Sequence, residues 1–258
     1  MKYTLITGSA SGLGKEFAYL YAKDKENLIL VDQNALALDN LKKELNQKYP
    51  NIDIKVYAID LSNMNNIKDF LFAISKEDIV VTRLINSAGF GDREDFVNMD
   101  IEKQIKMSEV NCNALLYLCH YFGKEMAKHK SGHIINVSSI AGFMSGPYMC
   151  TYHATKGYVL LLSESIGYEL KKYGVKVLTL CPGPFKSNFV KLAHNDYTFK
   201  KLKPLEAKDV AKKAYKASRR GKKLLITGVK NKLTVFITRF FPRSLITKVS
   251  AKSMKEGA

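Results

Sequence analysis

Lys2–Gly14, with the sequence Lys-Tyr-Thr-Leu-Ile-Thr-Gly-Ser-Ala-Ser-Gly-Leu-Gly, is the stretch that decides the fold. Its first six residues form a short apolar run typical of a buried strand, and a glycine-rich loop follows at once. Glycine lets the backbone turn tightly and approach a phosphate, while a helix that begins directly afterwards offers free N–H groups. The spacing of Gly8, Gly12 and Gly14 therefore favours dinucleotide binding over a strand-to-helix turn without a ligand.

Apolar strands alternate with helical patterns along most of the chain. We expect strands at 2–7, 27–31, 53–59, 83–86, 133–138, 175–181 and 223–227, and helices from the glycine loop to about 24 and at about 34–48, 63–75, 101–129, 152–172 and 206–218. The stretch 186–204 is polar and basic and has no clear periodicity. The alternation predicts a doubly wound, mostly parallel α/β sheet of the Rossmann type, because βαβ units place their strands in parallel. We expect a single domain over 1–230 with a basic C-terminal extension at 231–258.

The composition is that of an ordinary globular protein, with 46% apolar and 25% charged residues among 258. The first residues lack a signal-peptide pattern, and no run approaches the ~20 apolar residues that span a bilayer. The four cysteines lack the spacing of metal ligands. We therefore expect a cytoplasmic protein with reduced cysteines and no metal.

The net charge of +17 is concentrated near the C-terminus. Residues 1–199 hold 23 Lys and Arg against 21 Asp and Glu, whereas residues 200–258 hold 18 against 3. Within this region, 231–254 mixes basic and apolar residues, which predicts an amphipathic helix interrupted at Pro242. Such a helix has several possible roles: it could lie on an anionic membrane, pack against the domain or a partner subunit, or cover the substrate cleft. Nucleic acid is not an expected partner, because the basic region lacks a recognisable binding module.

Asp32 ends the second expected strand, 18 residues after Gly14. A carboxylate at this position can accept hydrogen bonds from both hydroxyls of an adenosine ribose and would repel a 2′-phosphate. Gln33 and Asn34 follow it, and Ser11 stands in the loop, so no cation is placed to receive that phosphate. The pattern favours NAD over NADP; the alternative is that Asp32 caps a helix or is a surface aspartate.

Tyr152 stands four residues before Lys156, so the two side chains share one face of an expected helix. A fixed positive charge beside a phenol favours the phenolate and moves its pKa toward working pH. By itself this spacing is also common on solvated helix faces.

These motifs together resemble the short-chain dehydrogenase/reductase family over residues 1 to about 227. The resemblance includes the glycine loop, and it extends through segments that occur in the family's order: Asp60, Asn86-Ser87-Ala88-Gly89, Asn111, Ser139, the Tyr152–Lys156 pair, Pro182-Gly183 and Ser187. Two positions depart from the family pattern. Ser87 replaces a second asparagine, and Ser187 stands where threonine is common.

The resemblance implies a catalytic group of four residues. Tyr152 is the general acid in reduction and the general base in oxidation, and Lys156 lowers the pKa of Tyr152 and binds the nicotinamide ribose. Ser139 orients the substrate oxygen, with Ser138 as the competing serine, and Asn111 holds a water that connects Lys156 to solvent. The cofactor residues that it implies are Gly8, Ser11, Gly12, Leu13, Gly14, Asp32, Asp60, Leu61, Asn86, Ala88, Gly89, Tyr152, Lys156, Pro182, Gly183 and Ser187.

The resulting hypothesis is an oxidoreductase that transfers a hydride between a nicotinamide cofactor, NAD in preference to NADP, and a secondary alcohol or ketone. In this family the substrate is bound by loops that correspond to about 90–98, 140–149 and 185–204, which here carry aromatic residues and methionines suited to an apolar molecule. Helices 101–129 and 152–172 resemble those through which family members form dimers and tetramers. The alternative is a non-catalytic dinucleotide-binding sensor or scaffold whose tail reaches a membrane or partner.

Overall fold

A seven-stranded parallel sheet forms the centre of the protein in the computed structural model, which describes residues 1–186 and 204–254. The strand order is β3-β2-β1-β4-β5-β6-β9. The strands are β1 Lys2–Thr7, β2 Asn27–Asp32, β3 Ile54–Ala58, β4 Val80–Asn86, β5 Gly132–Val137, β6 Val175–Cys181 and β9 Leu224–Ile226. This topology confirms the predicted doubly wound Rossmann-type sheet.

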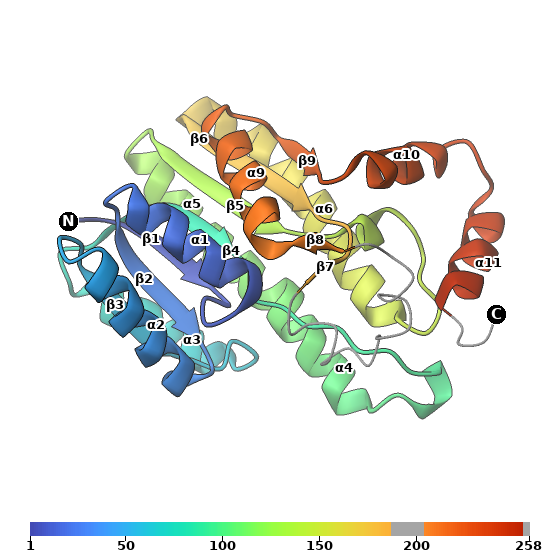
Figure 1. Cartoon of the computed structure of the whole chain (residues 1–258), viewed down its shortest axis with the longest axis horizontal. Helices are drawn as coiled ribbons and strands as arrows, with labels where there is room; N and C mark the ends of the chain where they lie inside the picture. The colour runs from blue at the N-terminus through green and yellow to red at the C-terminus, as the bar shows by residue number, and fades with distance from the viewer. Residues whose placement is uncertain (187–203, 255–258) are drawn as a thin grey trace.

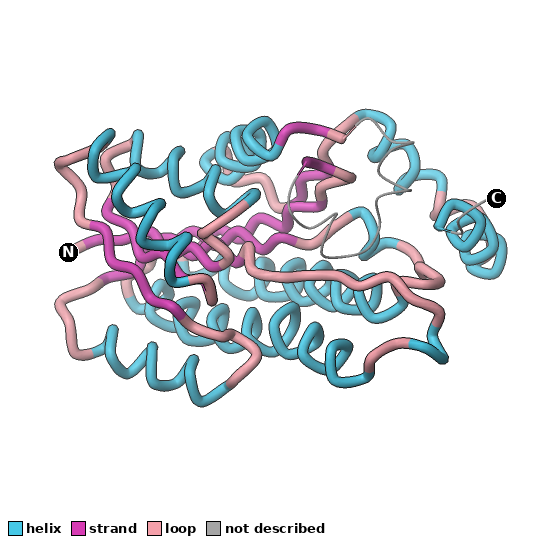
Figure 2. Tube along the Cα trace, turned by 60° about the horizontal axis from the view of Figure 1, so that its bottom comes forward, coloured by secondary structure: helices cyan, strands magenta, loops and turns pink. Residues whose placement is uncertain are grey.

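Helices cover both faces of the sheet, as Figures 1 and 2 show. One face packs against α1 Gly12–Lys23, α2 Ala35–Lys48 and α9 Ala207–Arg219, and the other packs against α3 Met64–Ser75, α5 Leu115–Lys128 and α6 Cys150–Leu170. Successive strand residues point to opposite faces, so Ile6 belongs to the first core and Leu5 to the second. Because both faces are covered, the central strands are continuously apolar rather than alternating.

The strand order reverses between β1 and β4, whose carboxyl ends lie side by side. Thr7 pairs with Val31 of β2 on one side and with Asn86 of β4 on the other. The connections from β1 and β4 leave in opposite directions, and ligands of open α/β sheets bind in the crevice that this arrangement creates. The loops that carry the glycine motif and the Asn86–Gly89 motif therefore meet at one edge.

The long helix expected over 101–129 is divided into three parts. It consists of α4 Ile101–Ser108, a π-helical segment η2 Glu109–Ala114 and α5. Single π-helical turns inside α-helices are frequent at functional sites. Strand β4 also begins at Val80, earlier than predicted, because Val80 and Val81 extend the pairing with β1.

The C-terminal part forms two helices joined at the predicted break. Helix α10 Val229–Ile237 and helix α11 Arg243–Met254 flank Pro242. They lie together at the end of the molecule farthest from the N-terminus (Figure 1). A two-stranded pair, β7 Phe185–Lys186 with β8 Leu205–Glu206, was not predicted, since two-residue strands carry no periodicity. In the part of the chain that the structure describes, no helix is long and apolar enough to cross a membrane.

Phe17 tests the packing between α1 and the sheet, because its side chain is fully buried. Replacing Phe17 with alanine should lower the free energy of unfolding by about 3–5 kcal/mol through lost burial and the cavity that remains. Denaturant titration monitored by circular dichroism measures this change. Phe72→Ala is the matched control, because Phe72 is 61% exposed on α3 and its loss should cost far less. Equal losses in the two variants would contradict the packing described.

Candidate active site

A cavity of about 1300 Å³ extends along the carboxyl ends of the strands. Its lining includes residues that follow β1, β2, β4, β5 and β6, and helices α10 and α11 close one side. Of the predicted site residues, the lining at one end includes Gly8, Ser11, Gly12, Leu13, Asp32 and Asp60, with Leu61 beside them. Toward the other end it includes Ala88, Gly89, Ser139, Tyr152, Lys156 and the Pro182–Gly183 pair. The fold therefore brings most of the predicted residues into one site.

The glycine loop and the loop after β4 lie in direct contact. Gly8 has a φ of +63°, and a Cβ added to it would lie 2.8 Å from the Ala88 backbone. The Thr7 hydroxyl oxygen accepts hydrogen bonds from the backbone N–H groups of Ser87 and Ala88, each at 3.1 Å. Gly14 does not line the cavity; a Cβ there would lie 2.1 Å from the Gly8 carbonyl oxygen, so its glycine lets the loop fold onto α1. The free N–H groups that begin α1 therefore lie at the cavity.

Asp32 is held at the rim by the backbone on both sides. Its carboxylate accepts hydrogen bonds from Ala10 N at 3.0 Å and from Asn34 N at 3.1 Å. The alternative that Asp32 caps a helix is wrong, because Asn34 is the residue whose side chain caps α2 by accepting from Ala37 N. Asp32 has no salt bridge within the described residues, 1–186 and 204–254.

Asp60 is joined to a lysine that the sequence did not single out. Its carboxylate accepts from Ser62 N and Ser62 Oγ and lies 3.0 Å from Lys106 Nζ. Burial opposes ionisation, but these hydrogen bonds and the lysine hold the pKa of Asp60 below its usual value. Lys106 lines the cavity from α4. Its role was missed because nothing in local sequence places α4 opposite the loop after β3.

Asn86 does not line the cavity, in contrast to its predicted role as a cofactor residue. Its side chain is buried, and Nδ2 donates to Asn136 Oδ1 at 2.8 Å. Asn136 Nδ2 in turn donates to Ser163 Oγ at 2.9 Å. This chain of amides joins β4, β5 and α6, so the Asn86 side chain supports the site from behind, while Ser87 faces the cavity instead.

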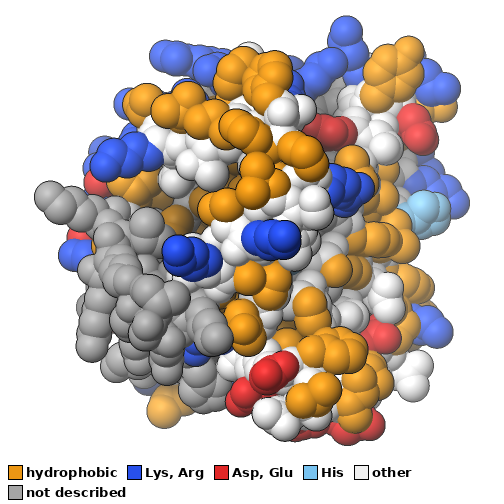
Figure 3. Space-filling view, turned by 90° about the vertical axis from the view of Figure 1, so that its right-hand side faces the viewer, with side chains coloured by type: hydrophobic (Ala, Val, Ile, Leu, Met, Phe, Trp, Pro, Cys, Tyr) orange, Lys and Arg blue, Asp and Glu red, His pale blue; other side chains and the backbone are white. Residues whose placement is uncertain are grey.

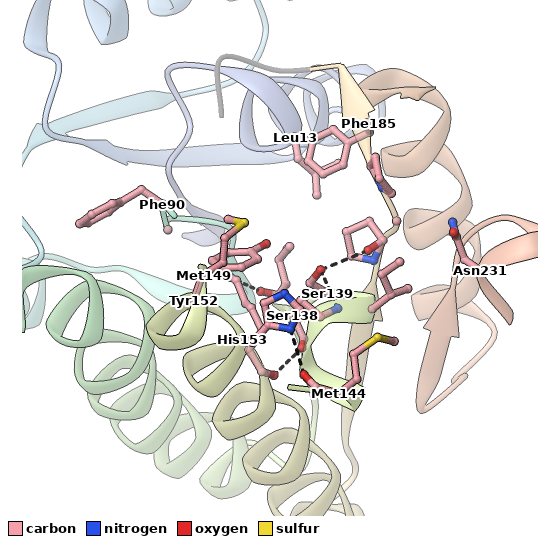
Figure 4. A pocket seen from close by; sticks show the side chains of 18 of the residues that line it. Leu13, Phe90, Ser138, Ser139, Met144, Met149, Tyr152, His153, Phe185 and Asn231 are labelled. Carbon is pink, nitrogen blue, oxygen red and sulfur yellow. Dashed lines mark hydrogen bonds between the residues drawn. The ribbon is translucent and has the colours of Figure 1, made fainter. Parts of the chain in front are cut away.

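Tyr152 and Ser139 meet at the enclosed end of the cavity. Tyr152 lies in the first turn of α6, and Ser139 begins the turn after β5; both line the cavity. The Ser139 hydroxyl oxygen accepts from Ala141 N at 3.1 Å and lies 3.5 Å from the Pro182 carbonyl oxygen. Figure 4 shows the two side chains converging, with Leu13 and Phe185 on the opposite wall. Ser138, the competing serine, donates its hydroxyl to the Lys156 carbonyl oxygen at 2.7 Å and is buried. The geometry therefore favours Ser139 over Ser138 as the serine that meets a substrate oxygen.

Burial is the main cause of the pKa shifts of both Tyr152 and Lys156. It raises the pKa of Tyr152 to about 12, although the hydrogen bond from Ser139 acts in the opposite direction. It lowers the pKa of Lys156 from 10.5 to about 8, against smaller opposing contributions from Cys112 and Cys181. The sequence-based expectation that Lys156 lowers the Tyr152 pKa is therefore not met by the protein alone. The ammonium donates to the Val137 carbonyl oxygen at 3.0 Å and lies 5.7 Å from the centre of the tyrosine ring.

Asn111 lies behind Gly89, inside the π-helical segment. Its amide oxygen accepts from Phe90 N at 3.1 Å, and its amide nitrogen donates to Phe90 O and to Thr155 Oγ1, each at 3.0 Å. A Cβ added to Gly89 would lie 2.7 Å from Asn111 Oδ1 and 3.3 Å from Lys156 Nζ. Both polar atoms thus border one small space that the missing side chain of Gly89 leaves open.

The segment after β6 places a further polar residue beside the cavity. A Cβ added to Gly183 would lie 2.1 Å from Asn231 Nδ2, so this glycine permits α10 to approach the backbone. Asn231 Nδ2 donates to Thr227 O at 2.7 Å, and the residue lines the cavity (Figure 4). Sequence analysis missed Asn231, because its approach depends on how α10 folds back. Ser187, also predicted here, lies outside the described residues.

Helices α10 and α11 supply one wall of the cavity. Counted with the segment that joins the two helices, half of their lining side chains are apolar: Ile237, Phe241, Leu245, Ile246, Val249 and Met254. The other half are polar: Asn231, Thr234, Thr238, Ser250, Lys252 and Ser253. Two tethers fix α11: Arg93 Nη2 donates to Met254 O at 2.7 Å, and the Ser145 and Thr247 hydroxyls lie 2.6 Å apart. Of the roles considered for the tail, the described residues are consistent with a cover over the cleft.

The fold and the cavity define an α/β protein with the features of a dinucleotide site: a helix N-terminus behind a glycine loop, a rim carboxylate and a deep tyrosine–lysine pair. A family model described as short chain dehydrogenase matches residues 2–198. The chain belongs to the short-chain dehydrogenase family. It is an oxidoreductase of that family, which uses a nicotinamide cofactor and acts on CH–OH donors.

Two relatives illustrate the similarity at the level of sequence. An uncharacterized oxidoreductase of Staphylococcus epidermidis is 28% identical over 210 residues, which cover 81% of this chain and 87% of that protein. A very-long-chain 3-oxoacyl-CoA reductase of Aspergillus terreus is 31% identical over 182 residues, which cover 68% of this chain and 50% of that protein.

Two solved structures share the fold. A short-chain dehydrogenase from Sphingobium yanoikuyae in complex with NADPH has a TM-score of 0.83 at 24% identity, with 93% of each chain covered. A short-chain dehydrogenase/reductase from Burkholderia phymatum in complex with NAD has a TM-score of 0.84 at 23% identity, also with 93% of each chain covered.

The buried Lys156 predicts a specific dependence of stability on pH. Because folding lowers its pKa from 10.5 to about 8, the unfolded chain binds more protons than the folded protein between these pH values. The contribution of Lys156 to stability therefore rises with pH through this window. The unfolding free energy of the wild type, measured relative to Lys156→Met, should increase from about pH 8 to pH 10.5. Lys43→Met, at an exposed position on α2, is the control, and parallel curves for wild type and Lys156→Met would contradict the burial of the ammonium.

Proposed function

We propose that the protein transfers a hydride between a nicotinamide cofactor, with NAD preferred, and an apolar secondary alcohol or ketone. The observation that carries the proposal is that Ser139, Tyr152 and the buried Lys156 line the same cavity that begins at Asp32. We assign the oxidoreductase chemistry to residues 1–230 and treat 231–258 as an extension that shapes the substrate side.

The residues of this chain bind, orient and move a proton. Ser139 donates a hydrogen bond to the substrate oxygen, and Tyr152 gives that oxygen a proton in reduction or removes one in oxidation. Lys156 would bind the nicotinamide ribose, and Asn111, whose Oδ1 borders Gly89 beside Lys156 Nζ, would hold the water that connects Lys156 with solvent. When bound, the cofactor supplies or accepts the hydride, so the protein contributes orientation and electrostatics. Burial holds the proton on Tyr152, and the Lys156 ammonium lies 5.7 Å from the centre of its ring.

An apolar substrate is supported by the wall that faces Tyr152. Met144 and Met149 line the cavity near the tyrosine, and α10 and α11 add aliphatic and aromatic side chains. The name of the Aspergillus relative, a very-long-chain 3-oxoacyl-CoA reductase, is in keeping with a ketone on an extended apolar chain.

We also propose a dimer or tetramer formed through α4, α5 and α6. These helices expose large apolar side chains, among them Ile105, Leu161 and Tyr168 at 49%, 66% and 80% exposure. Exposed apolar residues gathered on neighbouring helices favour association between subunits. Light scattering of the purified protein measures its oligomeric state.

Tyr152 provides the direct test of the chemistry. Tyr152→Phe removes the transferable proton but keeps the ring, so turnover of a ketone panel with NADH should fall at least 10²-fold, as expected for loss of a general acid. Binding of NADH, followed by its fluorescence, should stay within a few-fold of wild type. Tyr173→Phe, at an exposed tyrosine in the short 3-10 turn that follows α6, is the control and should keep full activity. Turnover by Tyr152→Phe at the wild-type rate would overturn the assignment.

Asp32 is expected to set the cofactor preference. The wild type should show a higher kcat/KM with NAD than with NADP, because the carboxylate repels a 2′-phosphate and accepts from the ribose hydroxyls. Asp32→Ser should lower the ratio of the two kcat/KM values by about tenfold or more, which corresponds to one lost charge-assisted hydrogen bond. Asp39→Ser, on the outer part of α2, is the control. A wild-type preference for NADP would contradict the proposal.

A further inference from the structure

Helix α10 exposes an apolar stripe on the side that does not line the cavity. Val229, Leu233, Phe236 and Phe240 follow one another at helical spacing and are 83%, 57%, 55% and 69% exposed. The rings of Phe236 and Phe240 lie edge to face with their centres 5.1 Å apart, so the stripe continues one turn past the end of the helix. None of the four lines the cavity, so the active site does not account for them.

Six cations occur in the same C-terminal segment as this stripe. The basic residues of 229–254 are Lys230, Lys232, Arg239, Arg243, Lys248 and Lys252, and the same span contains no Asp or Glu. Among the residues that the structure describes, none of the six takes part in a salt bridge. Figure 3, which views this end of the molecule, shows hydrophobic side chains and Lys or Arg side chains together across the face. We call the four apolar residues and the six cations the α10–α11 surface.

We propose that the α10–α11 surface binds an anionic lipid membrane peripherally. Interfacial helices combine large apolar side chains, which enter the boundary between headgroups and acyl chains, with cations that pair with anionic headgroups. Each Lys or Arg near such a surface strengthens binding, and the effect weakens with salt. A second copy of the chain fits this surface less well, because two such faces would bring six cations against six with no acidic residue between them.

The position of the surface connects it with the cavity. Leu245 and Val249 of α11 line the cavity and are also 43% and 61% exposed, so they form its outer edge. A membrane bound at the α10–α11 surface would therefore adjoin the apolar mouth of the site. This last step rests on the proposed apolar substrate, whereas membrane binding itself does not.

Co-sedimentation of the full chain with lipid vesicles tests the proposal. The probes are vesicles of phosphatidylcholine alone and vesicles in which about a third of the phospholipid is phosphatidylglycerol, an anionic content of the kind that attracts basic segments. The wild type should sediment with the anionic vesicles and remain in solution with the neutral ones. Adding salt should weaken the binding, because the cations are exposed.

Two variants separate the apolar and the charged contributions. Phe236→Ser with Phe240→Ser should weaken vesicle binding at least tenfold, because the variant loses the two aromatic side chains that the proposal inserts into the membrane. Lys230→Gln with Lys232→Gln and Arg239→Gln should weaken it about a hundredfold, as expected for three cations near an anionic surface. The matched controls are Leu36→Ser with Phe72→Ser, and Lys42→Gln with Lys43→Gln and Lys68→Gln, all on α2 and α3; both should bind as the wild type does.

Two outcomes would overturn the proposal. The first is a wild type that does not bind anionic vesicles; if Phe236→Ser with Phe240→Ser then changes the protein from dimer to monomer, the stripe is a subunit interface. The second is equal loss of binding in the control variants. Turnover without vesicles is measured in parallel; because the substituted residues do not line the cavity, failure of membrane binding leaves the oxidoreductase proposal standing.

Discussion

The close contact between the loops after β1 and β4 is the constraint on which the rest of the site depends. Thr7 accepts two backbone hydrogen bonds from the second loop, and Gly8 adopts a left-handed conformation with its α-carbon against Ala88. A side chain at Gly8 would push the loops apart and move the start of α1 away from the strand ends. Because the strand order reverses at this point, the same contact opens the crevice in which Asp32, the α1 N-terminus and Gly89 face one space.

Burial gives the chemical end of the cavity its properties. Burial is the largest cause of both pKa shifts in this site. It raises the pKa of the Tyr152 phenol to about 12 and lowers the pKa of the Lys156 ammonium to about 8. Both shifts favour the neutral forms, so each group keeps or releases its proton according to what lies beside it. Ser139 acts against burial and lowers the pKa of the Tyr152 phenol.

Much of this arrangement could be predicted from sequence, because it rests on local chemistry. Strand and helix periodicity predicted the parallel sheet, and the glycine loop, Asp32 and the Tyr152–Lys156 pair were found from residue types at short spacing. Contacts between distant segments could not be found in this way. Asn86 was expected at the cofactor, yet its amide is used to join β4 to β5, and Lys106 reaches Asp60 across 46 residues. The positions of Asn231 and of the wall at the cavity depend on how α10 and α11 fold back over the cleft. The spacing of residues within each helix does not predict this arrangement.

The central claim is that one cavity holds a nicotinamide dinucleotide with its adenosine at Asp32 and its reactive ring at Tyr152. A crystal structure of the protein grown with NADH measures this directly. The account predicts the adenosine ribose hydroxyls within hydrogen-bond distance of the Asp32 carboxylate, the pyrophosphate at the N-terminus of α1, and Lys156 Nζ against the nicotinamide ribose. A dinucleotide bound in the reverse direction, or outside the cavity between the β1 and β4 loops, would contradict it.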